Sequence, residues 1–470
     1  VWEYAELKYR EYRSCEAHAA LIKDEGFQVE IGVANIPTAF VATYGAGGPV
    51  IGILGEYDAL EGLSQTADLA ERKAIEPGGP GHGCGHNVLG AAALGAAVCV
   101  KDYMVEKGLA GTVKYFGCPA EEGGTGKVYM VRAGLFDDVD IVLAWHPAQF
   151  NFVWNGLDCL GILNTEYAFE GIAAHAASCP WQGRSALDAV ELMNIGANFL
   201  REHISTDARV HYAITDAGGT ATNIVHAHGK VLYTVRAPEM TDVWEIAARV
   251  DNIAEGAALM TGTTLKKRII SGCSNLRVTQ TVFDRLEENL KMVLPLDYSQ
   301  SDLEYADKFN AVLPRTDKPR LLYSLRRNYP GLSMAELEEM LAMPMANYLC
   351  TEYGAPASTD VGDVSWVVPT CQLHVACYPP YTPYHSWQMV ALGKSALVHK
   401  GIKAAARVLA MTALDFILDE EMLNRAKEDF KHMMGSGSYN CPIEHDYGEK
   451  TEVPRKIQKI PGENIERRLK

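Results

Sequence analysis

The sequence lacks the features that mark several common classes of protein. It contains no apolar run of membrane-spanning length and no recognisable signal peptide, so we expect no membrane segment. Basic residues are few: 43 Lys and Arg stand against 59 Asp and Glu, and the formal net charge is −16. Such a chain offers no broad basic surface, so we expect neither nucleic acid nor an anionic membrane as a partner.

Cysteine is also sparse, with 11 in 470 residues. This odd, low number does not suit a disulfide scaffold, and cysteines such as Cys99 lie in apolar runs, so we expect mostly buried free thiols in a cytoplasmic protein. No C-x-x-C motif is present. A thiol redox protein built on Cys84 is therefore the least favoured alternative, because nothing nearby would resolve an oxidised intermediate.

The length of the chain exceeds one ordinary core, so we expect at least two domains. The chain opens at Val1 inside what looks like a helix, and we expect further residues to precede it. Its first part alternates strands with helices, and polar residues follow the strands that we predict at 49–54, 111–116 and 139–144. Open α/β sheets bind ligands at the carboxyl ends of their strands, so this edge is the expected site.

The pattern changes in the middle of the chain. Predicted elements between 161 and 273 follow the order β-α-β-β-α-β, which is typical of a ferredoxin-like unit. We therefore predict an α/β fold: a mixed-sheet catalytic domain from 1–160 and 274–434, interrupted by an inserted α+β domain at 161–273. The charged, Pro- and Gly-rich residues 435–470 are expected to form a loosely packed extension.

A short motif, His82-Gly83-Cys84-Gly85-His86, offers the first candidate metal ligands. Cys84 and His86 supply a thiolate and an imidazole, which suit Zn(II), Mn(II) or Co(II). A Gly-rich turn around a core cysteine would give the same pattern.

Two adjacent carboxylates, Glu121 and Glu122, follow a predicted strand on a Gly-flanked loop. One can bind a metal while its neighbour reaches the metal-bound water as a general base. A capping box on the next helix is the structural alternative. His146, in a Trp-His-Pro segment that we expect to end a strand, and His385, at the start of a predicted helix, are weak candidates alone. Together these segments predict a catalytic metal site that hydrolyses a C–N bond.

The chain resembles the aminoacylase/carboxypeptidase family of metallopeptidases, in its amidohydrolase branch. The resemblance runs from Glu3 to about Leu418 and lies in the segments GEYDAL, GHGCGHN, CPAEEGGTGK, AWHPA, GIAAHAA, PWQGRSALDAVE, NFLREHI, TDVGDVSWVVPT and YHSWQMVALGKSA. It implies one or two divalent ions, Mn(II) or Zn(II), bound by Cys84, His86, Glu122, His146 and His385.

The same resemblance assigns further roles. It implies that Glu121 is the catalytic base and that Asp58 orients the site. It implies that His175 stabilises the oxyanion, often from the partner subunit, and that Asn223 and Arg236 hold the substrate's carboxylate. From the residues alone, His175 could be a surface histidine and Arg236 part of a strand-end salt bridge.

The expected activity is hydrolysis of the amide bond of an N-acyl, in particular N-aroyl, amino acid such as p-aminobenzoyl-glutamate. A dipeptidase, an aromatic deaminase or a non-catalytic partner subunit are the alternatives. The resemblance implies a homodimer through the inserted domain and allows a paralogous subunit. The sequence departs from the family at Glu61 and His226, where proline is usual. These departures bear on the substrate more than on the reaction, and His226 and His228 could form an adventitious metal site.

Overall fold

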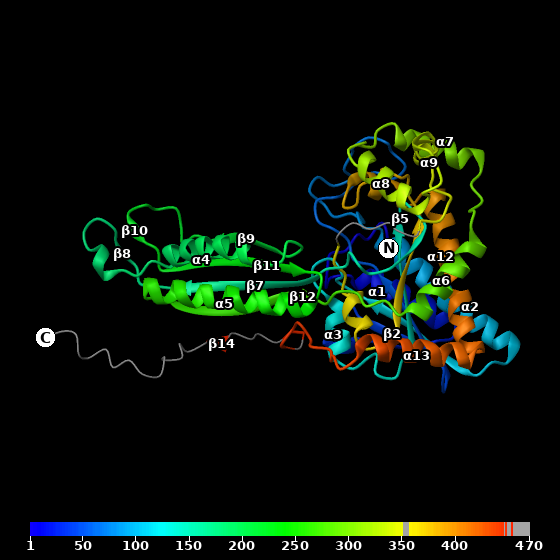
Figure 1. Ribbon diagram of the computed structural model, residues 1–470, viewed down its shortest axis with the longest axis horizontal. Coiled ribbons are helices and arrows are strands. Elements are labelled where there is room, and N and C mark those ends of the chain that lie inside the picture. The colour runs from blue at the N-terminus through cyan, green and yellow to red at the C-terminus, as the bar shows by residue number, and fades with distance from the viewer. Residues whose placement is uncertain (351–356, 446, 449–452, 455–470) are drawn as a thin grey trace. The chain divides into compact units, whose positions relative to one another are not determined.

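A computed structural model describes residues 1–350, 357–445, 447–448 and 453–454. The chain divides into two compact units, shown in Figure 1. Unit 1 comprises Val1–Leu160 and Cys273–Gly448, and unit 2 comprises Gly161–Gly272 with the short strand β14 (Val453–Pro454). A segment in the middle of the sequence therefore interrupts the segments that form unit 1.

Unit 1 is built on a seven-stranded sheet in the order β1-β2-β4-β3-β5-β13-β6. Its central pairs, β4 with β3, β3 with β5 and β5 with β13, are parallel, and the outer pairs are antiparallel. The sheet is therefore mixed, as expected. The strands are β1 (Gln28–Ile31), β2 (Phe40–Ala46), β3 (Val50–Glu56), β4 (Gly111–Cys118), β5 (Ile141–Ala148), β6 (Phe152–Trp154) and β13 (Thr370–Ala376).

Helices surround this sheet. They are α1 (Tyr12–Asp24), α2 (His86–Lys107), α3 (Gly126–Arg132), α6 (Gln280–Val293), α7 (Gln300–Asn310), α8 (Lys318–Asn328), α9 (Met334–Ala342), α10 (Val361–Ser365), α11 (Trp387–Leu392), α12 (Ala396–Leu418) and α13 (Glu420–Met434), with the 3-10 turn η1 (Val33–Asn35). Helix α2 packs on β3, β4 and β5 and against α12. A helix thus lies between the strands predicted at 49–54 and 111–116, as the alternating pattern indicated.

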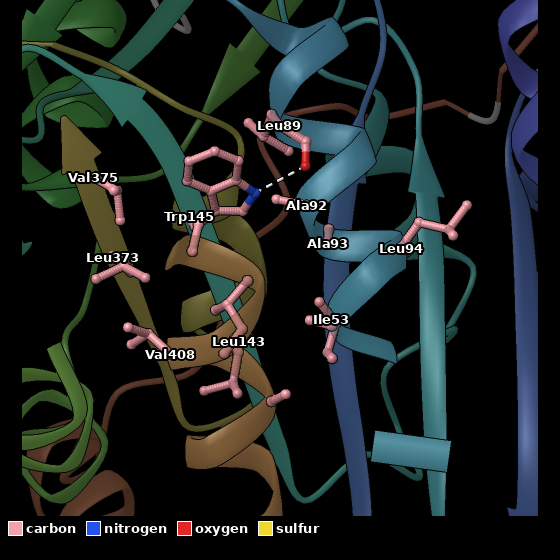
Figure 2. Close-up of a cluster of buried hydrophobic side chains, with 14 of the residues drawn as sticks. Ile53, Leu89, Ala92, Ala93, Leu94, Leu143, Trp145, Leu373, Val375 and Val408 are labelled. Carbon is pink, nitrogen blue, oxygen red and sulfur yellow. Dashed lines mark hydrogen bonds between the residues drawn. The ribbon is translucent and has the colours of Figure 1, made fainter. Parts of the chain in front are cut away.

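The core of unit 1 fixes which face of each strand is available for chemistry. Figure 2 shows Ile53, Leu143, Trp145, Leu373 and Val375 gathered with residues of α2 and with Val408 of α12. The indole of Trp145 donates a hydrogen bond to the carbonyl of Leu89 at 2.8 Å. Because successive side chains of a strand point to opposite faces, the neighbours of these residues in β5 and β13 face away from α2.

Helix α2 bears on the expectation that the chain has no membrane segment. By length and composition it is apolar enough to do so, and among the described residues it is the one helix that meets this test. However, 56% of its most apolar window is buried inside the protein. That is how the core helix of a globular domain is placed, between a sheet and a second helix.

Unit 2 contains a five-stranded sheet and two long helices. The sheet has the order β14-β12-β7-β11-β9, and β11 is antiparallel to both β7 and β9. Helices α4 and α5 pack against each other and on the sheet. The elements are β7 (Gly161–Glu170), β8 (Ala174–His175), η2 (Pro180–Gln182), α4 (Ala186–Leu200), η3 (Arg201–His203), β9 (Arg209–Asp216), β10 (Ile224–Val225), β11 (His228–Ala237), α5 (Met240–Thr261) and β12 (Thr264–Cys273).

Several local expectations were wrong. The first ten residues form turns instead of a helix, and α1 begins at Tyr12. Strand β5 continues beyond His146, because the parallel ladder with β13 does not need the missing amide of Pro147. The helix after His385, α11, has only six residues and is followed by two separate helices. Cys99 is exposed, although seven of the 11 cysteines are buried and all are free.

The start of the predicted extension also differs from expectation. Its described residues between 435 and 448 belong to unit 1, where the Tyr439 hydroxyl donates a hydrogen bond to Asp363 and Ile443 is buried. These contacts attach the start of the extension to unit 1. Most of the remaining extension lies outside the described residues.

Candidate metal centre

The loop before α2 is shaped by two glycines. Gly85 caps the helix with φ 80°, and a Cβ there would lie 2.5 Å from the Tyr378 hydroxyl. A Cβ on Gly83 would lie 2.4 Å from the Leu63 side chain. Only glycine tolerates both the close approach and the left-handed backbone, so this motif presents Cys84 and His86 in a fixed arrangement.

His86 is completely buried, and its two ring nitrogens have different environments. Nδ1 donates a hydrogen bond to Asp58 at 2.7 Å, while Nε2 forms no hydrogen bond. Burial acts to lower the pKa of His86, but the carboxylates of Asp58 and Glu56 outweigh it and raise the pKa well above its usual value. Asp58 thus fixes the ring and leaves Nε2 directed at its other neighbours.

The loop that carries the paired carboxylates is held by its backbone. Ala120 and Thr125 have positive φ angles of 60° and 59°, and the amide of Glu122 donates to Asp58 at 2.9 Å. Helix α3 begins only at Gly126 and receives no side-chain cap at its N-terminus. The capping-box interpretation of Glu121 and Glu122 was therefore wrong.

The two carboxylates point in different directions. Glu121 lies 3.8 Å from Nε2 of His86, whereas Glu122 lies 3.2 Å from Nε2 of His385. Burial, with the nearby charges of Glu56 and Glu122, raises the pKa of Glu121 well above its usual value. Burial also acts to raise the pKa of Glu122, but its contact with His385 leaves that pKa lowered. Of these two carboxylates, Glu121 is therefore the one that binds a proton more tightly.

Cys84 and His146 bring sulfur and nitrogen together. Sγ of Cys84 lies 3.4 Å from Nε2 of His146, and Nδ1 of His146 donates to the carbonyl of Pro147 at 2.9 Å. That hydrogen bond leaves the lone pair on Nε2, facing the sulfur. Burial lowers the pKa of His146 to about 4, so the ring is neutral near pH 7.

Three overlapping groups of side chains could hold a metal ion, and within each group the ligand atoms lie within 4.8 Å of one another. All three are in unit 1. They are Cys84 with His86 and His146, Cys84 with Glu122 and His385, and Glu56 with His86 and Glu121. The chain therefore brings together every metal ligand that the resemblance implied, with Glu121 and Asp58 beside them. Among the residues that the structure describes, His226 and His228 belong to no such group.

Sequence reasoning missed a second set of charged residues beside this cluster. Nζ of the fully buried Lys127 lies 2.5 Å from Glu56 and 2.6 Å from Asp360. Burial acts to lower the pKa of Lys127, but these two carboxylates raise it well above its usual value. The signal was available: Lys127 is a lone cation in an otherwise apolar and Gly-rich segment, and Glu56 precedes Asp58 by two positions at the end of a strand.

The candidate residues of unit 2 lie at two separate places. His175 and Asn223 are exposed neighbours at one end of the unit, where β8 pairs with β10 and the amide of Ala176 donates to the carbonyl of Asn223. Nδ1 of His175 accepts hydrogen bonds from the amides of Ala177 and Ser178, so its proton is on Nε2. The side chain of His175 is thus positioned by backbone amides.

Arg236 lies at the opposite end of unit 2. It pairs with Ile162 at the start of β7, whereas the other end of β11, His228, pairs with Glu170. A ten-residue antiparallel strand spans about 30 Å, so Arg236 and Asn223 of one chain cannot share a substrate carboxylate within this unit. A shared role for these two residues therefore requires one of them to come from a second chain.

The family of the chain follows from its sequence as well as from this geometry. Residues 52–439 match Peptidase family M20/M25/M40. The chain therefore belongs to this family, and it is a hydrolase of amide bonds.

Individual proteins of known name are similar to this chain over most of its length. The chain is 44% identical to the B-type subunit of p-aminobenzoyl-glutamate hydrolase from Escherichia coli, over 94% of this chain and 93% of that protein. It is 28% identical to the mouse Xaa-Arg dipeptidase, over 92% and 87% of the two chains. The crystal structure of an aminobenzoyl-glutamate utilization protein from Klebsiella pneumoniae superposes with a TM-score of 0.54 at 18% identity, covering 85% of this chain and 92% of that chain, and so supports the fold.

Proposed function

We propose that this protein is a metal-dependent amidohydrolase that cleaves the amide bond of an N-aroyl amino acid such as p-aminobenzoyl-glutamate. The observation that carries the proposal is the convergence of a sulfur, three imidazoles and three carboxylates at one place, where Nε2 of the buried His86 has no hydrogen-bond partner. Nitrogen, sulfur and oxygen donors of this kind suit Zn(II) or Mn(II). One or two such ions, held by Cys84, His86, Glu122, His146 and His385, would activate water and polarise the amide.

In this proposal the side chains divide the remaining work. Glu121 takes the proton from the attacking water and passes it to the leaving amine, a role that fits its raised pKa. Asp58 keeps the ring of His86 oriented through the hydrogen bond at Nδ1. His175 stabilises the oxyanion with its Nε2–H, and Asn223 and Arg236, supplied by two different chains, bind the carboxylate of the leaving amino acid.

Unit 2 would serve as a ferredoxin-like lid and dimerisation domain. Its strand order β12-β7-β11-β9 and its two helices support this assignment. Strand β9 is an edge strand, and Tyr212 and Ile214 on it are exposed, as is Phe199 of α4. An apolar edge of this kind favours pairing with a second chain. A homodimer is the simplest assembly, and the B-type designation of the E. coli relative also supports pairing with a paralogous chain.

The same site would also suit a dipeptidase or an aromatic deaminase. The mouse relative is named a dipeptidase, and a dipeptide, like an aromatic amine, would need the same ion and base. A non-catalytic role in a larger assembly is disfavoured because every predicted ligand and Glu121 are present. The free thiols support a reducing compartment, and we propose a cytoplasmic location on that ground.

The test is direct. Purified protein loaded with Mn(II) is incubated with p-aminobenzoyl-glutamate, and glutamate release is followed by mass spectrometry. We expect release that a chelator abolishes and that added Mn(II) or Zn(II) restores. Release that survives complete removal of metal would refute the mechanism, and cleavage of dipeptides in its place would favour the dipeptidase alternative.

A further inference from the structure

We propose that Glu56 is a further metal-binding residue of this site, held in place by Lys127 and Asp360. The proposal rests on the metal site of the proposed function and adds a ligand that the family resemblance did not assign. It comes from the third of the three side-chain groups, in which Glu56 lies with His86 and Glu121.

The unpaired atoms of this group carry the argument. Glu56 is 3% exposed and His86 is 0% exposed, and neither Oε2 of Glu56 nor Nε2 of His86 forms a hydrogen bond. The two atoms lie 3.3 Å apart. Buried polar atoms are rarely left without a partner, because burial removes their hydrogen bonds to water and nothing replaces them. Two ligand atoms bonded to one ion at about 2.0–2.2 Å lie about 3.0–3.5 Å apart, so a shared cation explains both orphaned atoms.

The other side of Glu56 is fixed by a buried cation. Its Oε1 lies 2.5 Å from Nζ of Lys127, and Asp360 accepts hydrogen bonds from both Nζ and the backbone amide of Lys127, at 2.6 and 2.9 Å. Lys127 is completely buried, and its Nζ contacts both carboxylates. One oxygen of Glu56 is therefore immobilised, and the second is left for a ligand.

Charge supports the same assignment. In the predicted ligand set only the thiolate of Cys84 and the carboxylate of Glu122 are anionic, and two divalent ions would bring more positive charge than these neutralise. The positive charge of Lys127 is balanced by Asp360, so the negative charge of Glu56 remains for the ion. A carboxylate beside an imidazole also suits Zn(II) and Mn(II) alike.

The test compares Glu56→Gln with the wild-type protein and reads metal binding before activity. Equilibrium dialysis against Zn(II) and Mn(II), with metal content measured by mass spectrometry, gives stoichiometry and affinity. The Co(II) forms are compared by absorption spectroscopy, since the d–d bands report the number of ligands. We expect Glu56→Gln to lose an ion or to bind it at least about 10-fold more weakly, with altered d–d bands. Glu56→Asp should retain part of the affinity.

A matched control separates binding from folding. Asp363 is also a completely buried carboxylate, and it accepts hydrogen bonds from Ser274 and Tyr439 without contacting any candidate ligand. Asp363→Asn should bind metal as the wild type does. Unchanged stoichiometry, affinity and Co(II) spectrum in Glu56→Gln would overturn the proposal for Glu56 alone. A wild-type protein that binds no metal would instead overturn the proposed function.

Discussion

The candidate residues of unit 1 and those of unit 2 differ in how the chain holds them. In unit 1, the buried Asp58 accepts hydrogen bonds from the ring of the buried His86 and from the backbone amide of Glu122. In unit 2, His175 and Asn223 are exposed at one end of the unit, and Arg236 lies at the other end, roughly 30 Å away along β11.

This difference indicates what one chain can do alone. Residues that hold an ion must converge within a few ångströms, and the unit 1 residues do so. Residues that contact a substrate need only meet when the substrate is bound, so they can come from separate elements or from a second chain. We therefore expect substitution of Glu121 to disable the site of its own chain, and the loss of His175 to be rescued by a second chain that still carries this residue.

The largest effect should come from the general base. Glu121→Gln removes the carboxylate that accepts the water proton but keeps the size of the side chain, so turnover should fall about 100-fold or more. Metal content, measured on the same preparation, should stay at the wild-type level because Glu121 is not among the five proposed ligands. Turnover close to that of the wild type would contradict the assignment of Glu121 as the general base.

The next effect should come from unit 2. His175→Ala removes one oxyanion donor and should lower turnover by about 100-fold, again without loss of metal. If His175 acts on the site of a second chain, co-expression of His175→Ala with Glu121→Gln should restore part of the activity, because one site of the mixed dimer then has both groups.

Two controls make this complementation decisive. Each variant co-expressed with itself should stay inactive, and size-exclusion chromatography should show dimers in every sample. Mixed dimers that remain inactive, or a fully active monomer, would show that His175 does not act in trans.

The sequence predicted most of the residues of the candidate site, but it did not predict how they are paired in space. Strand ends next to Asp58, Glu121 and Glu122 follow from apolar runs broken by polar residues, and the sheet edge brings them together. The buried contact of Lys127 with Asp360 joins residues 233 positions apart, and no local pattern encodes such a pairing. The separation of Asn223 from Arg236 depends on strand register, which spacing along the chain does not reveal.

A smaller effect is expected at the far end of β11. Arg236→Lys keeps the charge but loses the planar fork that binds both oxygens of a carboxylate, so KM for p-aminobenzoyl-glutamate should rise about 10-fold while kcat changes little. Inhibition by free glutamate should weaken by a similar factor. An unchanged inhibition constant, with normal metal content, would remove Arg236 from the substrate site.

The smallest expected effect is on the pH dependence of folding stability. It arises from a second difference between the units, their buried carboxylates. Unit 1 buries several carboxylates, whereas the described part of unit 2 buries none. Burial raises the pKa of Asp363 from 3.8 to about 7, although hydrogen bonds from Ser274 and Tyr439 act in the opposite direction. Because the folded state holds this proton more tightly than the unfolded chain, the stabilisation is complete below pH 3.8 and is lost as the pH rises to about 7.

Asp363→Asn should therefore remove part of the pH dependence of folding. Between about pH 6 and pH 7 the wild type should lose about 1 kcal/mol of unfolding free energy that the variant does not lose. Urea unfolding of the metal-free proteins, followed by circular dichroism at both pH values, measures the difference. All other titrating groups are common to the two proteins and cancel, so equal slopes would mean that Asp363 is already ionised in the folded chain, held by the donors of Ser274 and Tyr439.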